Sequence, residues 1–418
     1  MDFIKPSSNI LLIEPPFYRF FGYQRWYYPV TLTLLGTYLE ERGYAVRIYD
    51  ADRPTPQCRP LARGEVRKNY HLYEKALSNE AHPIWSEVRN TLVKYAPDVI
   101  GITSITPKIE SAVIVAKMAK ELFGKNVTTM LGGPHVQGMC KSHPGYDFGP
   151  HFDHVVTRIP NLVDRKPNKK LILDYEKYSA ENLSSMMTSS GCPNSCAFCC
   201  HSFEKRIIRR DIINLRTEIE EIKEWFGGVG PITTMDDCFF SNKKHFDAVI
   251  ALFKENNLAF NVGSRVMALS PEKIDAFIKH GGNHLYIGVE SGSQKILDRV
   301  GKRLEIEETI KRTKWLTEAG VPWQAFFIIG FPFETLDDLK MSVDIVDKIK
   351  PTFVSLNRFT PYPGTKIYDD YYKKYSLNFR DLFQLNNKSV VQLPEEMEEY
   401  INYMYSVFDK YNNDSNLR

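Results

Sequence analysis

Residues 188–203 read TSSGCPNSCAFCCHSF and hold four of the seven cysteines in a chain of 418 residues. Cys192, Cys196 and Cys199 have the spacing CxxxCxxC, and Cys200 directly follows the last of them. The remaining cysteines are scattered, at Cys58, Cys140 and Cys238. A small, odd number of cysteines in a chain this long does not make a disulfide framework, so the clustering predicts metal or redox chemistry.

The spacing of these cysteines limits which metal group they can hold. A structural zinc ion requires four closed ligands, and Cys200 is badly placed to supply the fourth. Three thiolates around a [4Fe-4S] cluster would instead leave one iron open, as a site that binds a substrate requires. We therefore predict that Cys192, Cys196 and Cys199 are the metal ligands of a [4Fe-4S] cluster. Structural zinc or chance spacing is the alternative.

The cysteine stretch lies at the start of a run of alternating strands and helices. One strand is expected at Ser185–Thr188, directly before the cysteines. Five more are expected at Ile232–Asp236, Ala259–Ser264, His284–Glu290, Gln324–Gly330 and Phe353–Phe359. Helices are expected between them, for example at Arg216–Phe226, Glu272–His280, Ile306–Ala319 and Leu336–Ile349. Six β/α units in succession predict a partial (β/α)6 TIM barrel.

The first part of the chain alternates in the same way. Strands are expected at Asn9–Glu14, Ala45–Tyr49, Asp98–Ser104, Val127–Leu131 and His154–Thr157, and helices at Thr31–Glu41 and Glu110–Phe123. The pattern predicts an α/β fold with a doubly wound, Rossmann-like parallel sheet whose ligand lies at the carboxyl ends of the strands. The insertion Arg53–Ala96 is expected as two helical pieces, and it either decorates the surface or caps a ligand.

Four regions follow from this organisation. They are a first domain at 1–160, a polar linker at 161–180, the partial barrel at 181–370, and a short helical C-terminal extension at 371–418 with a helix over Pro394–Tyr411. The linker contains a basic cluster, made of Arg165, Lys166, Lys169 and Lys170, whose charges are expected to be solvated.

Composition excludes several classes of protein. The chain has 54 Lys and Arg against 51 Asp and Glu, a formal charge of +3 that gives no reason to expect a nucleic-acid or membrane-surface partner. The longest apolar stretch, about Ala325–Phe331, is far shorter than the roughly 20 residues of a membrane span. The N-terminal apolar run is too short for a signal peptide. We expect a soluble cytoplasmic protein.

Several motifs that follow the cysteines in order resemble those of the radical S-adenosylmethionine (SAM) superfamily. The aromatic Phe198 precedes the last cysteine, and the acidic pair Asp236-Asp237 ends the second strand. Arg265 follows the third strand. GVESGSQKIL (288–297), IIGFPFET (328–335) and TPYPGT (360–365) end the next three strands. The resemblance covers about Ser185–Tyr368 and implies that SAM binds the open iron of the cluster.

The resemblance also suggests which residues bind SAM. Glu290 is the candidate for the amino group, with Ser291 nearby, and Arg265 is the candidate for the carboxylate. Phe198 and the turn Gly330–Pro332 could form an apolar slot for adenine. Alternatively, Glu290 only bonds a neighbouring turn and Arg265 makes a plain surface ion pair.

The first domain resembles that of cobalamin-dependent members of the superfamily. The segments that carry this likeness are IEPP (13–16), YPVTLTLLGTYLEERGYAV (28–46), ITSIT (102–106) and LGGPHV (131–136). Gly132 and Gly133 would let the backbone approach a corrin, and Ser104 and Thr106 could donate hydrogen bonds to it. No DxHxxG stretch is present, so base-off cobalamin without a lower histidine ligand is implied, with His135 as a candidate contact or a structural residue.

One departure from these relatives concerns the outer edge of the first domain. Relatives have a Gly-Glu-rich turn and a helix after the fifth strand, whereas this chain reads HVVTRIPNLVD (154–164), so the fifth unit is expected to be truncated. A degenerate domain that no longer binds cobalamin is the alternative.

The resemblance implies a cobalamin-dependent radical SAM methyltransferase that acts on an unactivated carbon. One SAM would methylate cob(I)alamin, and a second would be cleaved to a 5′-deoxyadenosyl radical that abstracts hydrogen before methyl transfer. The substrate would be a peptide or protein residue or a small molecule, and an external low-potential electron donor would be required. Catalytic candidates are Asp236, Asp237 and Tyr362; further candidate wall residues are Phe17–Tyr28, Asn357 and Arg358.

Two other functions remain open from the sequence. An enzyme with the same cofactors could catalyse a non-methylating rearrangement or cyclisation. The chain could also be a non-enzymatic iron–sulfur electron carrier. If the substrate is a protein, Arg53–Ala96 and the C-terminal helix are the expected docking surfaces.

Overall fold

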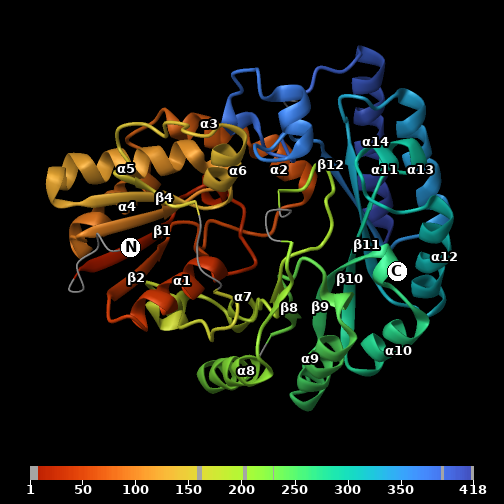
Figure 1. The fold of residues 1–418 in the computed structure, drawn as a ribbon, viewed down its shortest axis with the longest axis horizontal. Helices are drawn as coiled ribbons and strands as arrows, with labels where there is room; N and C mark the ends of the chain where they lie inside the picture. Colours follow the sequence, from red (N-terminus) through yellow and green to blue (C-terminus); the bar gives the residue numbers. More distant parts are fainter. Residues whose placement is uncertain (1–7, 158–161, 201–204, 229, 387–389, 416–418) are drawn as a thin grey trace. The chain divides into compact units, whose positions relative to one another are not determined.

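The computed structural model describes residues 8–157, 162–200, 205–228, 230–386 and 390–415, which form two compact units (Figure 1). Unit 1 comprises residues 1–183, 224–226 and 361–388, and unit 2 comprises residues 184–223, 227–360 and 389–418. The expected linker 161–180 therefore belongs to unit 1. The expected extension 371–418 is divided between the two units.

Unit 1 is built on a five-stranded parallel sheet with the strand order β2-β1-β3-β4-β5. Its strands are β1 (Asn9–Glu14), β2 (Ala45–Asp50), β3 (Val99–Thr103), β4 (Thr128–Gly132) and β5 (His154–Val155). The central residues of β1 are all buried, as expected for a strand covered on both faces. Because β1 pairs with both β2 and β3, the strand order reverses beside it, and ligands of such sheets bind at this position.

The helices of unit 1 cover both faces of this sheet. They are α1 (Val30–Glu40), α2 (Arg63–Asn69), α3 (His71–Leu77), α4 (Pro83–Tyr95), α5 (Ile109–Phe123), α6 (Pro134–Ser142) and α7 (Ala180–Leu183). Figure 1 shows α4 and α5 on one side of the sheet and α1 on the other. The fifth strand has two residues, fewer than the four expected at His154–Thr157, and the predicted truncation of that β/α unit stays a prediction.

The insertion Arg53–Ala96 forms three helices and not two, because the helical ladder is interrupted at Tyr70 between α2 and α3. It contributes to the core of the unit. Tyr73 is fully buried and Trp85 is 2% exposed, and both pack with Phe20. The insertion is therefore part of the packing of unit 1 and not a surface decoration.

The expected linker packs along α1 and β2. Leu173 N–H donates to the Ile48 carbonyl at 2.8 Å, and Asn168 N–H donates to Thr37 Oγ1 at 2.8 Å. The prediction that the basic cluster is solvated is wrong for Lys169, which is fully buried with its ammonium 5.1 Å from the ring centre of Tyr28. The sequence could not show this, because the aromatic partner lies far away in the chain.

Unit 2 is a half-barrel, a five-stranded parallel sheet with the order β12-β11-β10-β9-β8. Its strands are β8 (Ile232–Thr233), β9 (Phe260–Arg265), β10 (Gly282–Glu290), β11 (Trp323–Ile329) and β12 (Phe353–Arg358). The helices are α8 (Ile212–Phe226), α9 (Lys243–Glu255), α10 (Pro271–Lys279), α11 (Gln294–Arg299), α12 (Ile306–Glu318), α13 (Leu336–Ile349) and α14 (Glu395–Ser415). No helix among the described residues is long and apolar enough to span a bilayer.

The strand expected at Ser185–Thr188 is reduced to one parallel bridge between Met186 and Thr234, beside β8. The chain then leaves the barrel and forms β6 (Ser189–Ser190), which pairs antiparallel with β7 (Ile208–Arg209). The Thr188 N–H donates to the Asp236 carboxylate, so it does not extend a parallel ladder. The prediction of a sixth full strand is therefore wrong, although its place in the order is correct.

Candidate active site

The cysteine loop is held at both ends by the β6–β7 hairpin. Cys192, Cys196 and Cys199 lie between these strands and are half-buried. Ala197 N–H donates to the Val300 carbonyl at 2.8 Å, which ties the middle of the loop to the residue that follows α11. Cys199 N–H donates to the Cys196 carbonyl at 3.1 Å and closes a tight turn. The three thiols are therefore presented by one constrained loop.

The donor atoms of this loop suit a group bound by sulfur alone. Within the parts of the chain that the structure describes, no three His, Cys, Asp or Glu side chains, the loop cysteines included, are arranged as a group that could hold a metal ion. The assignment of ligands to this loop therefore rests on donor chemistry. The loop itself offers three thiols, and burial raises the pKa of Cys196, an effect that Lys302 and Arg265 partly offset. Soft thiolate donors near cations fit an iron–sulfur cluster.

Glu290 and Arg265 meet at the carboxyl ends of β10 and β9, and they share a partner that the sequence did not indicate. Lys302 Nζ donates to Glu290 Oε1 at 2.5 Å, and Arg265 Nη2 donates to the Lys302 carbonyl at 2.5 Å. Glu290 has a φ of 72°, which is rare for a residue with a side chain and marks a constrained position. A Cβ at Gly288 would lie 2.4 Å from Glu290 Oε1 and 2.9 Å from Lys302 Nζ, so a larger residue there would displace this ion pair.

Phe198 lies near the turn after β11, and the role of these residues as an adenine slot stays a prediction. The ring centres of Phe198 and Phe331 are 6.2 Å apart, and Gly330 has a φ of 82°. The neighbouring Pro332 is half-buried. Glu334 closes the turn, because its Oε2 accepts from Gly330 N–H at 2.5 Å and from Phe331 N–H at 3.2 Å.

Glu334 is a buried carboxyl group that the sequence analysis did not single out. Its Oε1 is buried with no hydrogen-bond partner. Burial raises the pKa of Glu334 to about 8, against the lowering effect of the two backbone hydrogen bonds. This side chain is therefore poised to be neutral near physiological pH.

Ser291 is engaged in packing. It is fully buried, its Oγ accepts from Ser293 N–H at 3.1 Å, and it lies 3.3 Å from Ser342 Oγ of α13. A Cβ at Gly292 would lie 2.1 Å from the Met341 carbonyl oxygen, so this turn sits directly on α13. The predicted role of Ser291 in SAM binding stays a prediction.

The acidic pair Asp236-Asp237 faces the entry of the cysteine loop. Asp236 accepts hydrogen bonds from Thr188 and Ser189, and Asp237 accepts one from Gly191 N–H at 2.8 Å. Burial raises the pKa of Asp236 to about 6, although the hydrogen bonds from Thr188 and Ser189 lower it.

The remaining barrel-end candidates have partners of their own. Tyr362 belongs to unit 1, and its hydroxyl donates to Gln384 Oε1 at 2.6 Å. Arg358 is buried and paired with Glu398 of α14. Asn357 Nδ2 donates to the Phe327 carbonyl at 3.5 Å. The aromatic stretch Phe17–Tyr28 contributes Phe17 and Phe21 to the core of unit 1.

The candidate cobalamin contacts gather at the carboxyl ends of β3 and β4. Ser104 N–H donates to the Gly132 carbonyl at 2.9 Å, and His135 N–H donates to the Ser104 carbonyl at 3.0 Å. Gly133 has a φ of 101°, and a Cβ there would lie 2.7 Å from the Ser104 backbone. The glycine is thus explained by contact with Ser104 itself.

His135 is 1% exposed and lies between the rings of Phe148 and Phe379. Its Nδ1 is 3.2 Å from Thr106 Oγ1, and burial lowers its pKa to about 3, so the ring is neutral. His135 Nε2 is buried without a hydrogen-bond partner. It is a polar atom at this sheet edge that a bound group could satisfy.

Buried charges at the same sheet edge were missed by the sequence analysis. Lys108 pairs with Glu14 at 2.5 Å and with Asp52 at 2.9 Å, and Arg25 pairs with Asp50 at 2.5 Å. Burial opposes the charge on Lys108, but Asp52 and Glu14 raise its pKa above the ordinary value. The sequence signal that could have indicated this network is the acidic residue at the end of β1, Glu14, and the one that follows β2, Asp52.

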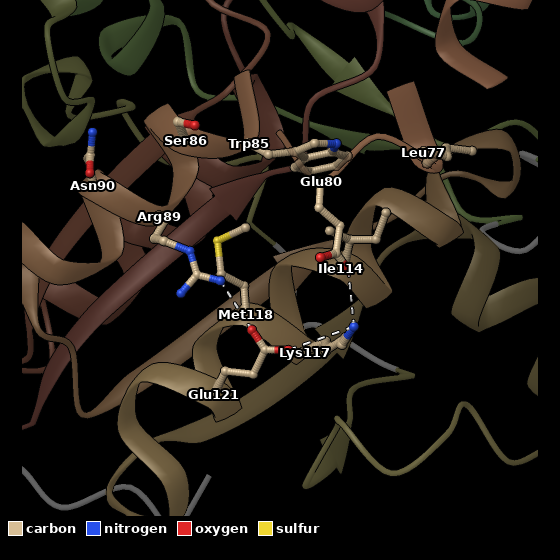
Figure 2. Close-up of a pocket in the computed structure, with 10 residues that line it drawn as sticks. All are labelled: Leu77, Glu80, Trp85, Ser86, Arg89, Asn90, Ile114, Lys117, Met118 and Glu121. Atoms are coloured by element: carbon tan, nitrogen blue, oxygen red, sulfur yellow. Dashed lines mark hydrogen bonds and ion pairs between the residues drawn. The ribbon is translucent and has the colours of Figure 1, made fainter. Parts of the chain in front are cut away.

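A separate groove of about 260 Å³ lies between α4 and α5 of unit 1 (Figure 2). Trp85, Ile114 and Met118 contribute its apolar lining. Its charged rim pairs internally, with Arg89 3.1 Å from Glu121 and Lys117 3.4 Å from Glu80. An apolar lining with ion pairs at the rim is what two packed helices with solvated outer residues present.

A parallel half-barrel with three cysteines on the loop after its first strand position agrees with the radical SAM resemblance of the sequence. Residues 186–346 match the family model described as "Radical SAM superfamily". Unit 2 therefore contains a radical SAM domain, which uses SAM and a [4Fe-4S] cluster.

Two relatives match longer parts of the chain. An uncharacterized methyltransferase of Pyrococcus horikoshii is 29% identical over 332 residues, which cover 68% of this chain and 72% of the relative. The anaerobic magnesium-protoporphyrin IX monomethyl ester cyclase of Rubrivivax gelatinosus is 23% identical over 377 residues, which cover 78% of this chain and 67% of the relative.

Solved structures resemble the fold across both units. The radical SAM methyltransferase TsrM of Kitasatospora setae, solved with cobalamin and a [4Fe-4S] cluster, has a TM-score of 0.62 at 15% identity and covers 86% of this chain and 77% of its own. The cobalamin-dependent SAM radical enzyme OxsB, with aqua-cobalamin bound, has a TM-score of 0.57 at 16% identity and covers 81% of this chain and 52% of its own. At these identities the likeness establishes the fold alone.

Proposed function

We propose that the protein is a cobalamin-dependent radical SAM methyltransferase that acts on an unactivated carbon of a peptide or protein residue or of a small molecule. The observation that carries the proposal is that Cys196, on the loop with the other two cysteines, lies near Arg265, Glu290 and Lys302 at the carboxyl end of the half-barrel, with Phe198 beside Phe331. The methyltransferase relative and the TsrM-like fold of both units support the choice of reaction.

The residues of unit 2 would hold the cluster and SAM in distinct ways. The thiolates of Cys192, Cys196 and Cys199 would bind three irons. Arg265 would bind the carboxylate of SAM, since a guanidinium is a good partner for a carboxylate. Glu290 would share its carboxylate between Lys302 and the amino group of SAM, and Phe198 and Phe331 would cover the adenine.

The residues of unit 1 would provide the cobalamin site. Ser104, Thr106, Gly132 and Gly133 lie at the carboxyl edge of the sheet, where ligands of such folds bind. His135 Nε2 is a buried polar atom without a hydrogen-bond partner in the protein, and a bound cofactor could supply one. When bound, the cluster and SAM supply hydrogen abstraction from the substrate, and cobalamin supplies the methyl group. An external low-potential donor would supply the electron.

The first test is SAM cleavage under a strong reductant by the protein loaded with iron and sulfide. We expect formation of 5′-deoxyadenosine by the wild-type protein and by Cys200→Ala, and none by Cys196→Ala. No 5′-deoxyadenosine from the wild-type protein would favour the iron–sulfur electron carrier and contradict the proposal.

A cobalamin-dependent cyclisation or rearrangement without methyl transfer is the second candidate, and the cyclase relative favours it. SAM labelled in its methyl group distinguishes the two reactions. The methyltransferase delivers the label to its product, whereas the cyclase-like reaction leaves the product unlabelled.

A further inference from the structure

We propose that Asp236 and Asp237 are positioning residues that fix the entry of the cysteine loop, and that retention of the cluster depends on them. This inference rests on the iron–sulfur part of the proposed function and needs neither cobalamin nor a substrate. It assigns the acidic pair a task other than the catalytic one that the sequence suggested.

Four hydrogen bonds run from the loop entry to the two carboxylates. Asp236 Oδ1 accepts from Thr188 N–H at 2.7 Å, and its Oδ2 accepts from Thr188 Oγ1 at 2.5 Å and from Ser189 Oγ at 2.7 Å. Asp237 Oδ2 accepts from Gly191 N–H at 2.8 Å. The acidic pair thus contacts three of the four residues directly before Cys192.

Backbone contacts explain why these side chains are needed. The barrel-side pairing of this segment is a single bridge, in which Met186 N–H donates to the Thr233 carbonyl at 3.0 Å and Met235 N–H donates to the Met186 carbonyl at 2.8 Å. Beyond Met186 the chain turns away from the sheet. The acidic pair follows β8, and its carboxylates accept the hydrogen bonds that a longer strand pairing would otherwise make. The barrel strand thereby fixes the position of the loop entry.

The conformation of the loop entry requires such a restraint. Gly191 has a φ of 97°, a region open to glycine and rare for other residues, so the turn into Cys192 is flexible in the isolated chain. Asp237 fixes the N–H of this glycine. On the other side, the Thr188 carbonyl accepts from Arg210 N–H at 2.9 Å and lies 3.1 Å from His245 Nε2. Both sides of Thr188 are therefore held.

The burial and partners of Asp236 suit positioning better than proton transfer. The residue is 8% exposed, and both carboxylate oxygens accept hydrogen bonds from the loop entry. An amide could keep most of these bonds, since its oxygen can accept from Thr188 N–H and its NH₂ can donate to the two hydroxyls. Asparagine therefore separates the two roles: it preserves positioning and abolishes acid–base chemistry.

The experiment compares Asp236→Ala, Asp237→Ala and the matching Asn variants after anaerobic loading with iron and sulfide. We expect the Ala variants to lose bound iron about tenfold faster than the wild-type protein, because buried donors are left without an acceptor. The Asn variants should stay within about threefold. In the metal-free proteins, alkylation of Cys192 should be faster in the Ala variants. Asp247→Ala, an exposed aspartate on α9, is the matched control and should behave as wild type.

A second pair of variants guards against global unfolding. Thr188→Val and Ser189→Ala each remove one hydroxyl donor and keep both carboxylates, and we expect each to speed iron loss by a smaller factor. Wild-type iron retention in both Ala variants would overturn the positioning role. Asn variants that keep iron but no longer cleave SAM would also overturn it, in favour of acid–base catalysis. A wild-type protein that binds no iron would instead refute the proposed function.

Discussion

The carboxyl edges of the two parallel sheets differ in how their polar groups are satisfied. At the edge of unit 1, the charged groups are paired, Lys108 with Glu14 and Asp52 and Arg25 with Asp50, and a buried atom without a partner is Nε2 of the neutral His135. At the edge of unit 2, the thiols are half-buried, and Glu334 has a buried oxygen without a partner. Ligands of parallel α/β folds bind at such edges. The two edges therefore differ in whether their charged groups are already paired within the protein.

The difference indicates what kind of ligand each edge could bind. The edge of unit 2 has groups that could bind a charged ligand, whereas the edge of unit 1 could bind a ligand through shape and hydrogen bonds. Unit 2 carries ligand donors and a carboxyl group whose ionisation burial opposes, both of which a bound cofactor can use. Unit 1 has neutralised its charges internally and presents mainly hydroxyls, backbone and a neutral His135. A ligand at that edge would be bound by shape and hydrogen bonds, which suits a large amide-bearing cofactor better than a phosphate.

The largest expected effect is the loss of the cluster from unit 2. Alanine at Cys192, Cys196 or Cys199 should reduce bound iron from about four per chain to near zero, because two thiolates do not retain a cluster. Iron and sulfide analysis after anaerobic loading measures this. Cys200→Ala is the matched control and should keep the cluster; an equal loss of iron in Cys200→Ala would show that the ligands are assigned wrongly.

The next largest effect is expected from a substitution that disrupts the buried charge network of unit 1. Lys108→Met leaves the buried carboxylate of Asp52 without its cation and leaves Glu14 with only Arg25, 3.7 Å away, and we expect a loss of about 3–5 kcal/mol in local stability. Native-state hydrogen exchange of the β1 and β3 amides measures it. Lys117→Met, at an exposed lysine of α5, is the control. Unchanged exchange in Lys108→Met would mean that the network does not stabilise this edge.

A pH effect is expected from Glu334. Its folded-state pKa of about 8 lies above the ordinary glutamate value of 4.5, so the folded protein binds this proton more tightly than the unfolded chain. Stability should therefore fall as pH rises from about 4.5 to 8, by at most about 1.4 kcal/mol per pH unit. Urea unfolding of wild type and Glu334→Gln at several pH values should show a weaker decline in the variant. Parallel pH dependence would contradict the assignment.

The smallest effect concerns the segment 361–388 of unit 1. Ser142 Oγ donates to Asp369 at 2.5 Å and accepts from Gly364 N–H at 2.8 Å. Ser142→Ala should weaken the attachment of this segment by about 1 kcal/mol, seen as faster hydrogen exchange of Gly364 and its neighbours. Ser406→Ala, on α14, is a control of the same chemistry, and equal exchange in both variants would contradict the role of Ser142.

The elements that the sequence predicted well are those with a local cause. The apolar run of β1 and the amphipathic spacing of α13, Leu336–Ile349, each determine their element from neighbouring residues. Ser185–Thr188 was mispredicted because side chains from another strand decide its pairing.

The candidate site divides in the same way. The cysteine spacing is local and could be read directly, whereas the partners of Glu290 and Asp236 depend on the folded chain. Lys108 and Glu14 are separated by 94 residues, and no periodicity joins them. Tyr362 follows the last barrel strand, yet it packs within unit 1, because the segment after Thr360 leaves the barrel.

The most direct test of the account is the cofactor content of the wild-type protein prepared anaerobically with iron, sulfide and cobalamin. Iron and corrin are measured per chain, together with the absorption spectrum. The proposed function predicts about four irons and about one corrin. About four irons with no corrin would contradict it, because unit 1 would then have no part in methyl transfer.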